Sequence, residues 1–322
     1  MKASGRVLRC ARRGKKLLLC VALCTAGGAL CLWSGIVREA VYGALTLCVR
    51  SVVPALFPFL ILNALWVESG LAARLSWMLR GAASALLGVG CCSTPLLLGL
   101  IGGYPVGAGC IGAMARRGEC TREEGERMLC FCCNTGPSFL AVGVGGAMLG
   151  SVREGWLLYG AQVLAALCTG VLLRVLLGRV RGAPGTVRPP ALRWDAALPV
   201  RAVSDAAPAM LKICGFAAAF GVLPALLGEA GAWLGHPLSP LGRALLTGFF
   251  EVSGGCDAAA GLEGRAALTL CGCLCGWGGV SVHLQCRAAL DGSGLRMRGF
   301  AAVRLLQSAL CGLFCLLLCK FF

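Results

Sequence analysis

A polar turn interrupts one of the most apolar stretches of this chain. The run from Met128 to Leu149 is almost wholly hydrophobic except at Cys132–Phe139, which reads CCNTGPSF. Proline removes a helical hydrogen bond, glycine disfavours a regular helix, and Asn, Thr and Ser add side-chain donors and acceptors. In hydrocarbon an unpaired backbone group is costly, so such a break persists only where protein or a water-filled cavity satisfies it. Many transporters build their binding site from broken helices, and this is the first hypothesis for the chain.

The composition predicts a polytopic integral membrane protein. Of the 322 residues, 58% are hydrophobic and only 14% are charged, which is too apolar for an ordinary soluble domain. Several apolar windows exceed about 18 residues, the length of a membrane span. The 48 glycines fit this class, because small residues let membrane helices approach closely. We therefore expect an all-α membrane protein, with the lipid bilayer as its first partner.

The formal net charge of +16 predicts the orientation of the chain rather than a nucleic-acid partner. Basic residues gather at residues 2–16 and again at residues 174–201, and the positive-inside rule makes both segments cytoplasmic. Neither cluster has the interleaved aromatic residues of a single-strand binding surface. The sequence therefore predicts a multi-pass protein of a cell membrane with a cytoplasmic N-terminus, and no nucleic-acid binding.

The first apolar segments allow more than one interpretation. Leu17–Ile36 follows the basic N-terminus and is expected to be an uncleaved first membrane helix, with a cleaved signal peptide as the alternative. Glu39–Arg50 is a mixed segment that predicts an interfacial helix before a separate membrane helix over Ser51–Val67. Leu71–Gly88 carries arginines beside an apolar stripe, which is typical of a helix at the membrane surface.

The residues that usually carry metal or catalytic chemistry do not form a recognisable set. Most of the 22 cysteines lie in apolar segments, where they act as small hydrophobic residues. Cys130 and Cys133 form a single CxxC, whereas a zinc site usually needs two such pairs or suitably spaced histidines. HExxH, GxSxG and P-loop motifs are absent from the sequence. We expect no catalytic residues, no metal, no cofactor, and no enzyme or ATP-driven pump.

The two halves of the chain repeat the same order of interruptions. Val52–Leu56 corresponds to Ala206–Met210, Leu98–Gly107 to Leu246–Gly255, and Asn134–Ser138 to Trp277–Ser281. Paired interruptions at matching positions of inverted repeats are the best sequence indication of a transporter site. The predicted division is a basic N-terminus with the first helix (1–38), a first repeat (39–178), a basic linker (179–203) and a second repeat (204–322).

These motifs carry a resemblance to a known family. Val53–Leu62, Gly103–Ala108 and Cys133–Phe139 resemble the bacterial YlbJ/SpoVV sporulation integral membrane protein family, within the nucleoside-recognition (Gate) superfamily. The resemblance covers roughly residues 40–300. It implies a role in endospore formation and movement of dipicolinate across the outer forespore membrane. The Gate domain in turn resembles the core of concentrative nucleoside transporters, with two repeats, re-entrant hairpins and partly unwound helices around the substrate.

The interruptions supply the candidate site. Their polar side chains and exposed backbone groups could contact a substrate, with helix–helix hydrogen bonding or a simple hinge as the alternative. The predicted substrate-binding residues are Gly103, Tyr104, Pro105, Asn134, Thr135, Gly136, Pro137, Ser138, Ser253, Gly254, Gly255, Gly278, Gly279, Ser281 and Gln285.

Two charged residues lie within apolar runs and need a separate explanation. An ionisable group at membrane depth is costly and indicates function by default. Glu251 could therefore bind a coupling cation or a proton, or it could only pair with Lys212. Lys212 could equally attract a carboxylate substrate or extend to the membrane surface.

The sequence is compatible with three functions. The first is a transporter of a small organic anion, with dipicolinate expected from the resemblance. The second is a nucleoside-recognising permease or gate, which the Asn, Ser and Gln side chains favour. The third is a membrane scaffold of sporulation that transports nothing. A homo-oligomer is compatible with all three.

Overall fold

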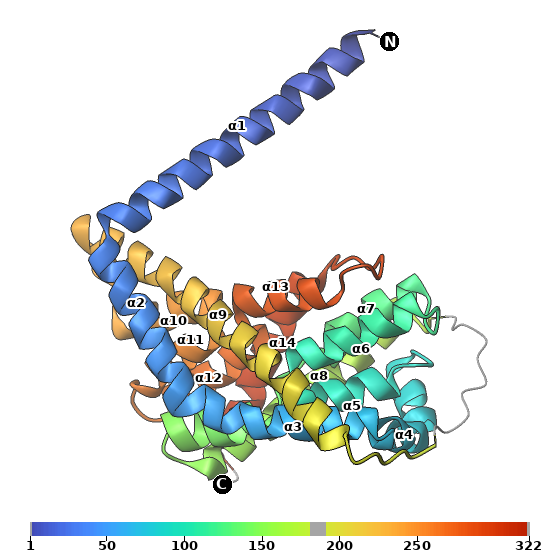
Figure 1. Cartoon of the computed structure of the whole chain (residues 1–322). Helices are drawn as coiled ribbons and strands as arrows, with labels where there is room; N and C mark the ends of the chain where they lie inside the picture. Colours follow the sequence, from blue (N-terminus) through green and yellow to red (C-terminus); the bar gives the residue numbers. More distant parts are fainter. Residues whose placement is uncertain (1, 181–190, 321–322) are drawn as a thin grey trace.

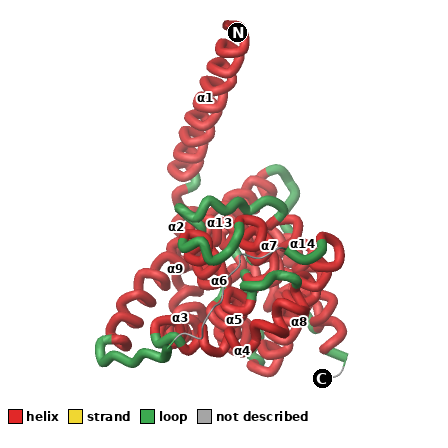
Figure 2. Tube along the Cα trace, turned by 90° about the vertical axis from the view of Figure 1, so that its right-hand side faces the viewer, coloured by secondary structure: helices red, strands yellow, loops and turns green. Residues whose placement is uncertain are grey.

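The computed structural model describes residues 2–180 and 191–320 and contains only helices and loops there (Figure 2). Residues 181–190 of the predicted basic linker, and the two ends of the chain, lie outside the described residues. The all-α fold class is confirmed. The helices are α1 (Lys2–Leu32), α2 (Ser34–Leu47), η1 (Cys48–Val52), α3 (Val53–Glu68), α4 (Leu71–Leu87), α5 (Ser93–Gly102), α6 (Tyr104–Arg116), α7 (Arg122–Cys132), η2 (Ser138–Met148), α8 (Val152–Leu177), α9 (Leu198–Trp233), α10 (Pro240–Phe250), α11 (Val252–Ala260), α12 (Arg265–Trp277), α13 (Gly279–Ala289) and α14 (Phe300–Leu318).

Within the described ranges, five helical stretches are long and apolar enough to cross a membrane. They are Ser34–Glu68, Val152–Leu177, Leu198–Trp233, Arg265–Ala289 and Phe300–Leu318. Shorter apolar helices cover Leu17–Leu32, Ser93–Gly102 and Ser138–Met148. The predicted multi-pass membrane protein is therefore supported by the length and apolar character of these helices. Helix α1 extends away from the other helices as a separate rod, with its apolar residues 17–24 exposed (Figure 1).

One expectation about the first repeat is wrong. Residues 34–68 form a single continuous helical stretch, so Glu39–Arg50 is not a separate interfacial helix before a span over Ser51–Val67. The π-helical segment η1 joins α2 to α3 just before Pro54. Proline lacks a backbone N–H, and a local π turn lets the chain stay helical around such a residue.

Each half of the chain contributes a hairpin of two short helices that cross at glycines. In the first half, α5 and α6 meet where Gly99 and Gly107 pack against the carbonyl group of Cys132. In the second half, α10 and α11 meet where Gly248 packs against Gly255. A Cβ atom at Gly99 or Gly255 would overlap backbone atoms of the neighbouring segment, so only glycine permits these crossings.

The long helices α2, α3 and α9 form a wall beside these hairpins. Helix α9 runs antiparallel to the α2–α3 rod, because Arg201 near its start lies 3.1 Å from Glu68 at the end of α3 (Figure 1). Near the other end of α9, Glu229 lines the same cavity as Ala40 of α2. Pro208 and Pro224 do not interrupt α9.

A continuous series of contacts joins the arginine-rich loops along one edge of the molecule (Figure 1, right-hand side). The Arg193 N–H donates to the Ser69 carbonyl, and the Val180 N–H donates to the Gly88 carbonyl. Arg127 donates to the carbonyl group of Gly178 at 3.0 Å. Further contacts are Arg116 to the Asp291 carbonyl at 2.7 Å and the Arg296 N–H to Glu126 at 3.0 Å. The described residues on either side of 181–190, the α6–α7 loop and the α13–α14 loop therefore share this edge, which we call the basic edge.

Candidate functional site

Helices break at the positions that the glycine and proline motifs indicate. Gly103 separates α5 from α6 with φ +90°, and residues 133–136 form a non-helical stretch between α7 and η2. Glu251 separates α10 from α11, and Gly278 separates α12 from α13 with φ +87°. Left-handed backbone at Gly103 and Gly278 is strained for other residue types, so these glycines set the breaks.

The breaks pack against one another in pairs, one pair in each half. A Cβ atom at Gly136 would lie 2.8 Å from the Ile101 carbonyl oxygen, beside the Gly103 break. A Cβ atom at Gly279 would lie 3.0 Å from the Phe250 carbonyl oxygen, beside the Glu251 break. Backbone thus contacts backbone, and helix ends from both halves meet in the interior.

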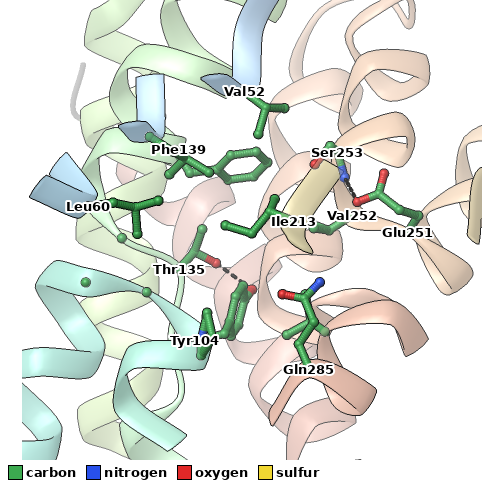
Figure 3. Close-up of a pocket in the computed structure, with 16 residues that line it drawn as sticks. Val52, Leu60, Tyr104, Thr135, Phe139, Ile213, Glu251, Val252, Ser253 and Gln285 are labelled. Atoms are coloured by element: carbon green, nitrogen blue, oxygen red, sulfur yellow. Dashed lines mark hydrogen bonds between the residues drawn. The ribbon is translucent and has the colours of Figure 1, made fainter. Parts of the chain in front are cut away.

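A cavity of about 70 Å³ lies where these ends meet the wall of long helices (Figure 3). We call it the central cavity. One side is apolar and comes from η1, α3, η2 and α9; the other side comes from the breaks and from α13. The lining from η1, α3, η2 and α9 is Val52, Leu56, Leu60, Phe139 and Ile213, and the lining from the breaks and α13 is Gly102, Gly103, Tyr104, Pro105, Thr135, Gly136, Glu251, Val252, Ser253, Val282 and Gln285.

Hydroxyl groups and a main-chain carbonyl organise the polar side. The Tyr104 hydroxyl donates to the carbonyl group of Cys275, and the Thr135 hydroxyl donates to the Tyr104 oxygen at 2.5 Å. These residues come from α6, from the 133–136 break and from α12. The Gln285 amide points toward the space between Tyr104 and Val252 (Figure 3). No hydrogen bond of the Gln285 amide occurs within the described residues, which leaves this group for a solute or water.

Glu251 is 6% exposed and caps the start of α11. Its carboxylate accepts the Ser253 N–H at 3.0 Å and the Gly254 N–H at 2.7 Å. A carboxylate at a helix N-terminus is stabilised by the free N–H groups and by the helix dipole. No ion pair joins Glu251 to Lys212 in the part of the chain that the structure describes.

Lys212 instead lines a second, larger cavity of about 380 Å³ together with Asp205. Both residues lie on the face of α9 that turns toward α6 and α13. The side chains that separate this cavity from the central cavity line both: Leu60, Pro105, Ile213 and Gln285. We call the second cavity the vestibule, because a shift of these four residues would join it to the central cavity.

The structure brings part of the predicted site to the central cavity and holds part of it elsewhere. Gly103, Tyr104, Pro105, Thr135, Gly136, Glu251, Ser253 and Gln285 line this cavity. Gly254 lines a separate cavity on the other side of Glu251. The predicted residues outside its lining are Asn134, Pro137, Ser138, Gly254, Gly255, Gly278, Gly279 and Ser281.

Asn134 lies in a buried amide network behind the cavity. Its side-chain oxygen accepts hydrogen bonds from Gln307 at 2.7 Å and from Gln162 at 3.2 Å, and its amide donates to the Phe131 carbonyl at 2.8 Å. Asn134, Gln162 and Gln307 are all fully buried. Its oxygen therefore accepts two hydrogen bonds and its amide donates one, and these bonds support the break from behind.

Sequence reasoning missed Arg304, Gln307 and Gln162, which lie in the apolar helices α14 and α8. The signal that singled out Glu251, a charged residue inside an apolar run, was equally present at Arg304 in the stretch 301–322. The apolar lining from α3 and α9 had no local signal, because Leu60 and Ile213 look like any lipid-facing or core residue.

No family model and no curated protein matches this chain. Among solved structures, one described as "Structure of CNTnw in an inward-facing substrate-bound state" is similar at 15% identity and a TM-score of 0.44. The similarity covers 90% of this chain and 81% of that chain.

Proposed function

We propose that this protein is a membrane transporter for a small polar organic solute, which binds in the central cavity. The observation that carries the proposal is the meeting of broken helix ends from both halves around a cavity with one polar and one apolar side. Such breaks place main-chain groups and polar side chains at the depth of the membrane, and many transporters bind their solute at such a site.

A neutral solute with both a polar and an apolar face fits this lining best, and a nucleoside is the leading candidate. No Lys or Arg lines the central cavity among the described residues, and the ionisable groups there are Glu251 and Tyr104. A dianion would have to leave water without a cationic partner, which is costly. Hydroxyl and amide groups of Thr135, Tyr104 and Gln285 could instead bond a ribose or a base.

Dipicolinate, which the family resemblance implies, is the second candidate. The helices α6, η2, α11 and α13 all begin at breaks beside the cavity, and helix N-termini favour negative charge. Lys212 in the vestibule would supply a cation along the way. A role in sporulation and a place in the outer forespore membrane rest on the resemblance alone.

Transport would require the cavity to open. A volume of about 70 Å³ holds a few waters, whereas ligand pockets for organic molecules measure about 300–1,000 Å³. Movement of the broken-helix ends against α3 and α9 would separate Leu60 and Ile213 from Pro105 and Gln285. The central cavity would then join the vestibule of about 380 Å³, which gives a solute a route inward.

The basic edge gives the proposed orientation. Its arginine-rich loops would face the cytoplasm by the positive-inside rule. The predicted cytoplasmic N-terminus agrees with this orientation if α1 crosses the membrane once, because α2 and α3 then return to the basic edge.

Uptake into proteoliposomes tests the proposal. Labelled uridine, adenosine and dipicolinate are compared for wild type, for Thr135→Val and for the matched control Thr269→Val. Thr269 lies in α12, and its buried hydroxyl has no hydrogen-bond partner among the described residues, so valine removes no hydrogen bond there. Loss of the Thr135 hydroxyl is expected to raise KM for a nucleoside about 10-fold, the value of one to two buried hydrogen bonds.

The outcomes separate the candidates. Saturable nucleoside uptake that Thr135→Val weakens and Thr269→Val does not would support the leading candidate. Uptake of dipicolinate alone would move the assignment to the organic anion. Absence of uptake of all three solutes, in wild-type protein with a cooperative thermal transition, would favour a non-transporting scaffold.

A further inference from the structure

Arg304 is a fully buried cation inside the apolar helix α14. A charged side chain at such a position is costly unless its hydrogen bonds and its charge are both satisfied. No carboxylate forms an ion pair with Arg304 among the residues that the structure describes. Its compensation must therefore come from another source.

That source is the main chain at two helix ends. Arg304 Nη1 donates to the carbonyl oxygen of Cys133 at 2.8 Å, where α7 ends. Its Nη2 donates to the carbonyl oxygen of Cys275 at 3.3 Å, and its Nε to that of Trp277 at 3.4 Å, where α12 ends. The remaining contact of Nη1 is the Gln307 side-chain oxygen at 2.7 Å.

These two helix ends can neutralise the guanidinium. A helix C-terminus carries roughly half a negative charge on its unpaired carbonyl groups. Two such ends together provide about one negative charge, spread over oxygens that the planar guanidinium fork can reach. Because carbonyl groups compensate the charge of Arg304, Glu251 does not serve as its counter-ion. The Glu251 carboxylate caps α11 and lines the central cavity instead.

The chain segments held by Arg304 are those that lead into the central cavity. Cys133 is followed by Thr135 and Gly136, which line it. The Tyr104 ring centre lies 5.2 Å from the Arg304 guanidinium carbon, and the Tyr104 hydroxyl shares the Cys275 carbonyl with Arg304. Through Gln307, the contact continues to Asn134.

We propose that Arg304 is a positioning residue that joins the broken helices of the two halves and thereby fixes the polar side of the central cavity. It does not line the cavity and would not touch a solute. Its role in solute binding rests on the proposed function, whereas its role in holding the two breaks together does not.

Hydrogen exchange and uptake, measured on the full-length protein, test this inference together. The variants are Arg304→Met, Arg304→Lys and the control Arg265→Met, which removes an exposed arginine at the start of α12. Arg304→Met is expected to speed amide exchange about 10- to 100-fold in residues 131–137 and in residues 273–281 together, since charged hydrogen bonds are lost at both. Arg304→Lys keeps the charge but reaches fewer carbonyl groups, so a smaller increase than in Arg304→Met is expected at the same two segments.

For a transported nucleoside, KM should rise by a similar factor in the same order, with Arg304→Lys between wild type and Arg304→Met. Unchanged exchange at both breaks, or a change at only one of them, would overturn the inference. If Arg304→Met does not fold, the lysine variant alone decides by the same criterion. If wild type carries none of the solutes, the proposed function fails, and the exchange data still decide the role of Arg304.

Discussion

Gly99→Ala is expected to destabilise this protein strongly, although it adds one methyl group. The new Cβ would overlap the carbonyl oxygen of Cys132, an atom of the main chain at the end of α7. A flexible side chain could move aside, but Cys132 is held by α7 and by the break that follows it. Overpacking typically costs about 1–3 kcal/mol, and a clash of backbone against backbone lies at or above the upper end of that range.

The matched control is Gly109→Ala in the next helix, α6. A Cβ atom at Gly109 would have no neighbouring atom within 4 Å, so alanine meets open space there. Since alanine is favoured over glycine within a helix by about 0.5–1 kcal/mol, Gly109→Ala should fold as well as wild type or better. The measurement is the monodisperse fraction and the thermal midpoint of detergent-purified protein. A Gly99→Ala variant with a wild-type midpoint would show that the α5–α6 crossing can widen enough to admit a methyl group.

Glu251→Gln is expected to abolish accumulation of solute against a gradient while leaving a folded protein. Glutamine retains an oxygen that can cap α11, so the cost in stability should be about 1 kcal/mol, as for other lost charges at a cap. Glutamine cannot bind or release a proton and attracts a cation far less than a carboxylate does. Glu251 lines both the central cavity and the separate cavity that Gly254 lines on its other side. It is therefore the proposed coupling group.

The measurement compares concentrative uptake, driven by an imposed proton or sodium gradient, with exchange of solute at equilibrium. In Glu251→Gln, we expect concentrative uptake to fall at least about 10-fold further than exchange does. The control is Glu263→Gln, the same change at an exposed position in the α11–α12 loop, which should alter neither. If Glu251→Gln still accumulates solute to the wild-type level, Glu251 is only a helix cap and the coupling proposal is wrong.

The breaks themselves were predictable from sequence because their cause is local. Glycine at Gly103 and Gly278 permits left-handed backbone, and the Thr-Gly-Pro run around Gly136 cannot continue a regular helix. The repeated order of these motifs also predicted that each break in the first half has a counterpart in the second half. Membrane class and helical content followed from the length of the apolar segments, which can be read from the sequence without knowing the tertiary contacts.

It was less predictable which of the polar side chains at the breaks line the central cavity, because this depends on the direction in which each side chain points. Asn134 and Thr135 are adjacent, yet Thr135 lines the central cavity and Asn134 bonds Gln162 and Gln307 behind it. The sequence also allowed Glu251 to pair with Lys212, whereas Glu251 caps α11 and Lys212 lines the vestibule. Within a non-helical stretch, no periodicity indicates which way a residue points.

The sequence by itself determined the membrane class, the helical content and the positions where helices break, because apolar length and backbone chemistry act within a few neighbouring residues. Only the tertiary structure decided which wall closes the cavity and how the buried charges are compensated. Ile213 and Leu60 became cavity residues through packing of α9 and α3 against the breaks. Arg304 donates hydrogen bonds to the main-chain carbonyl groups of residues 133, 275 and 277. Every residue type has the same main-chain carbonyl group, so the sequence does not indicate these contacts.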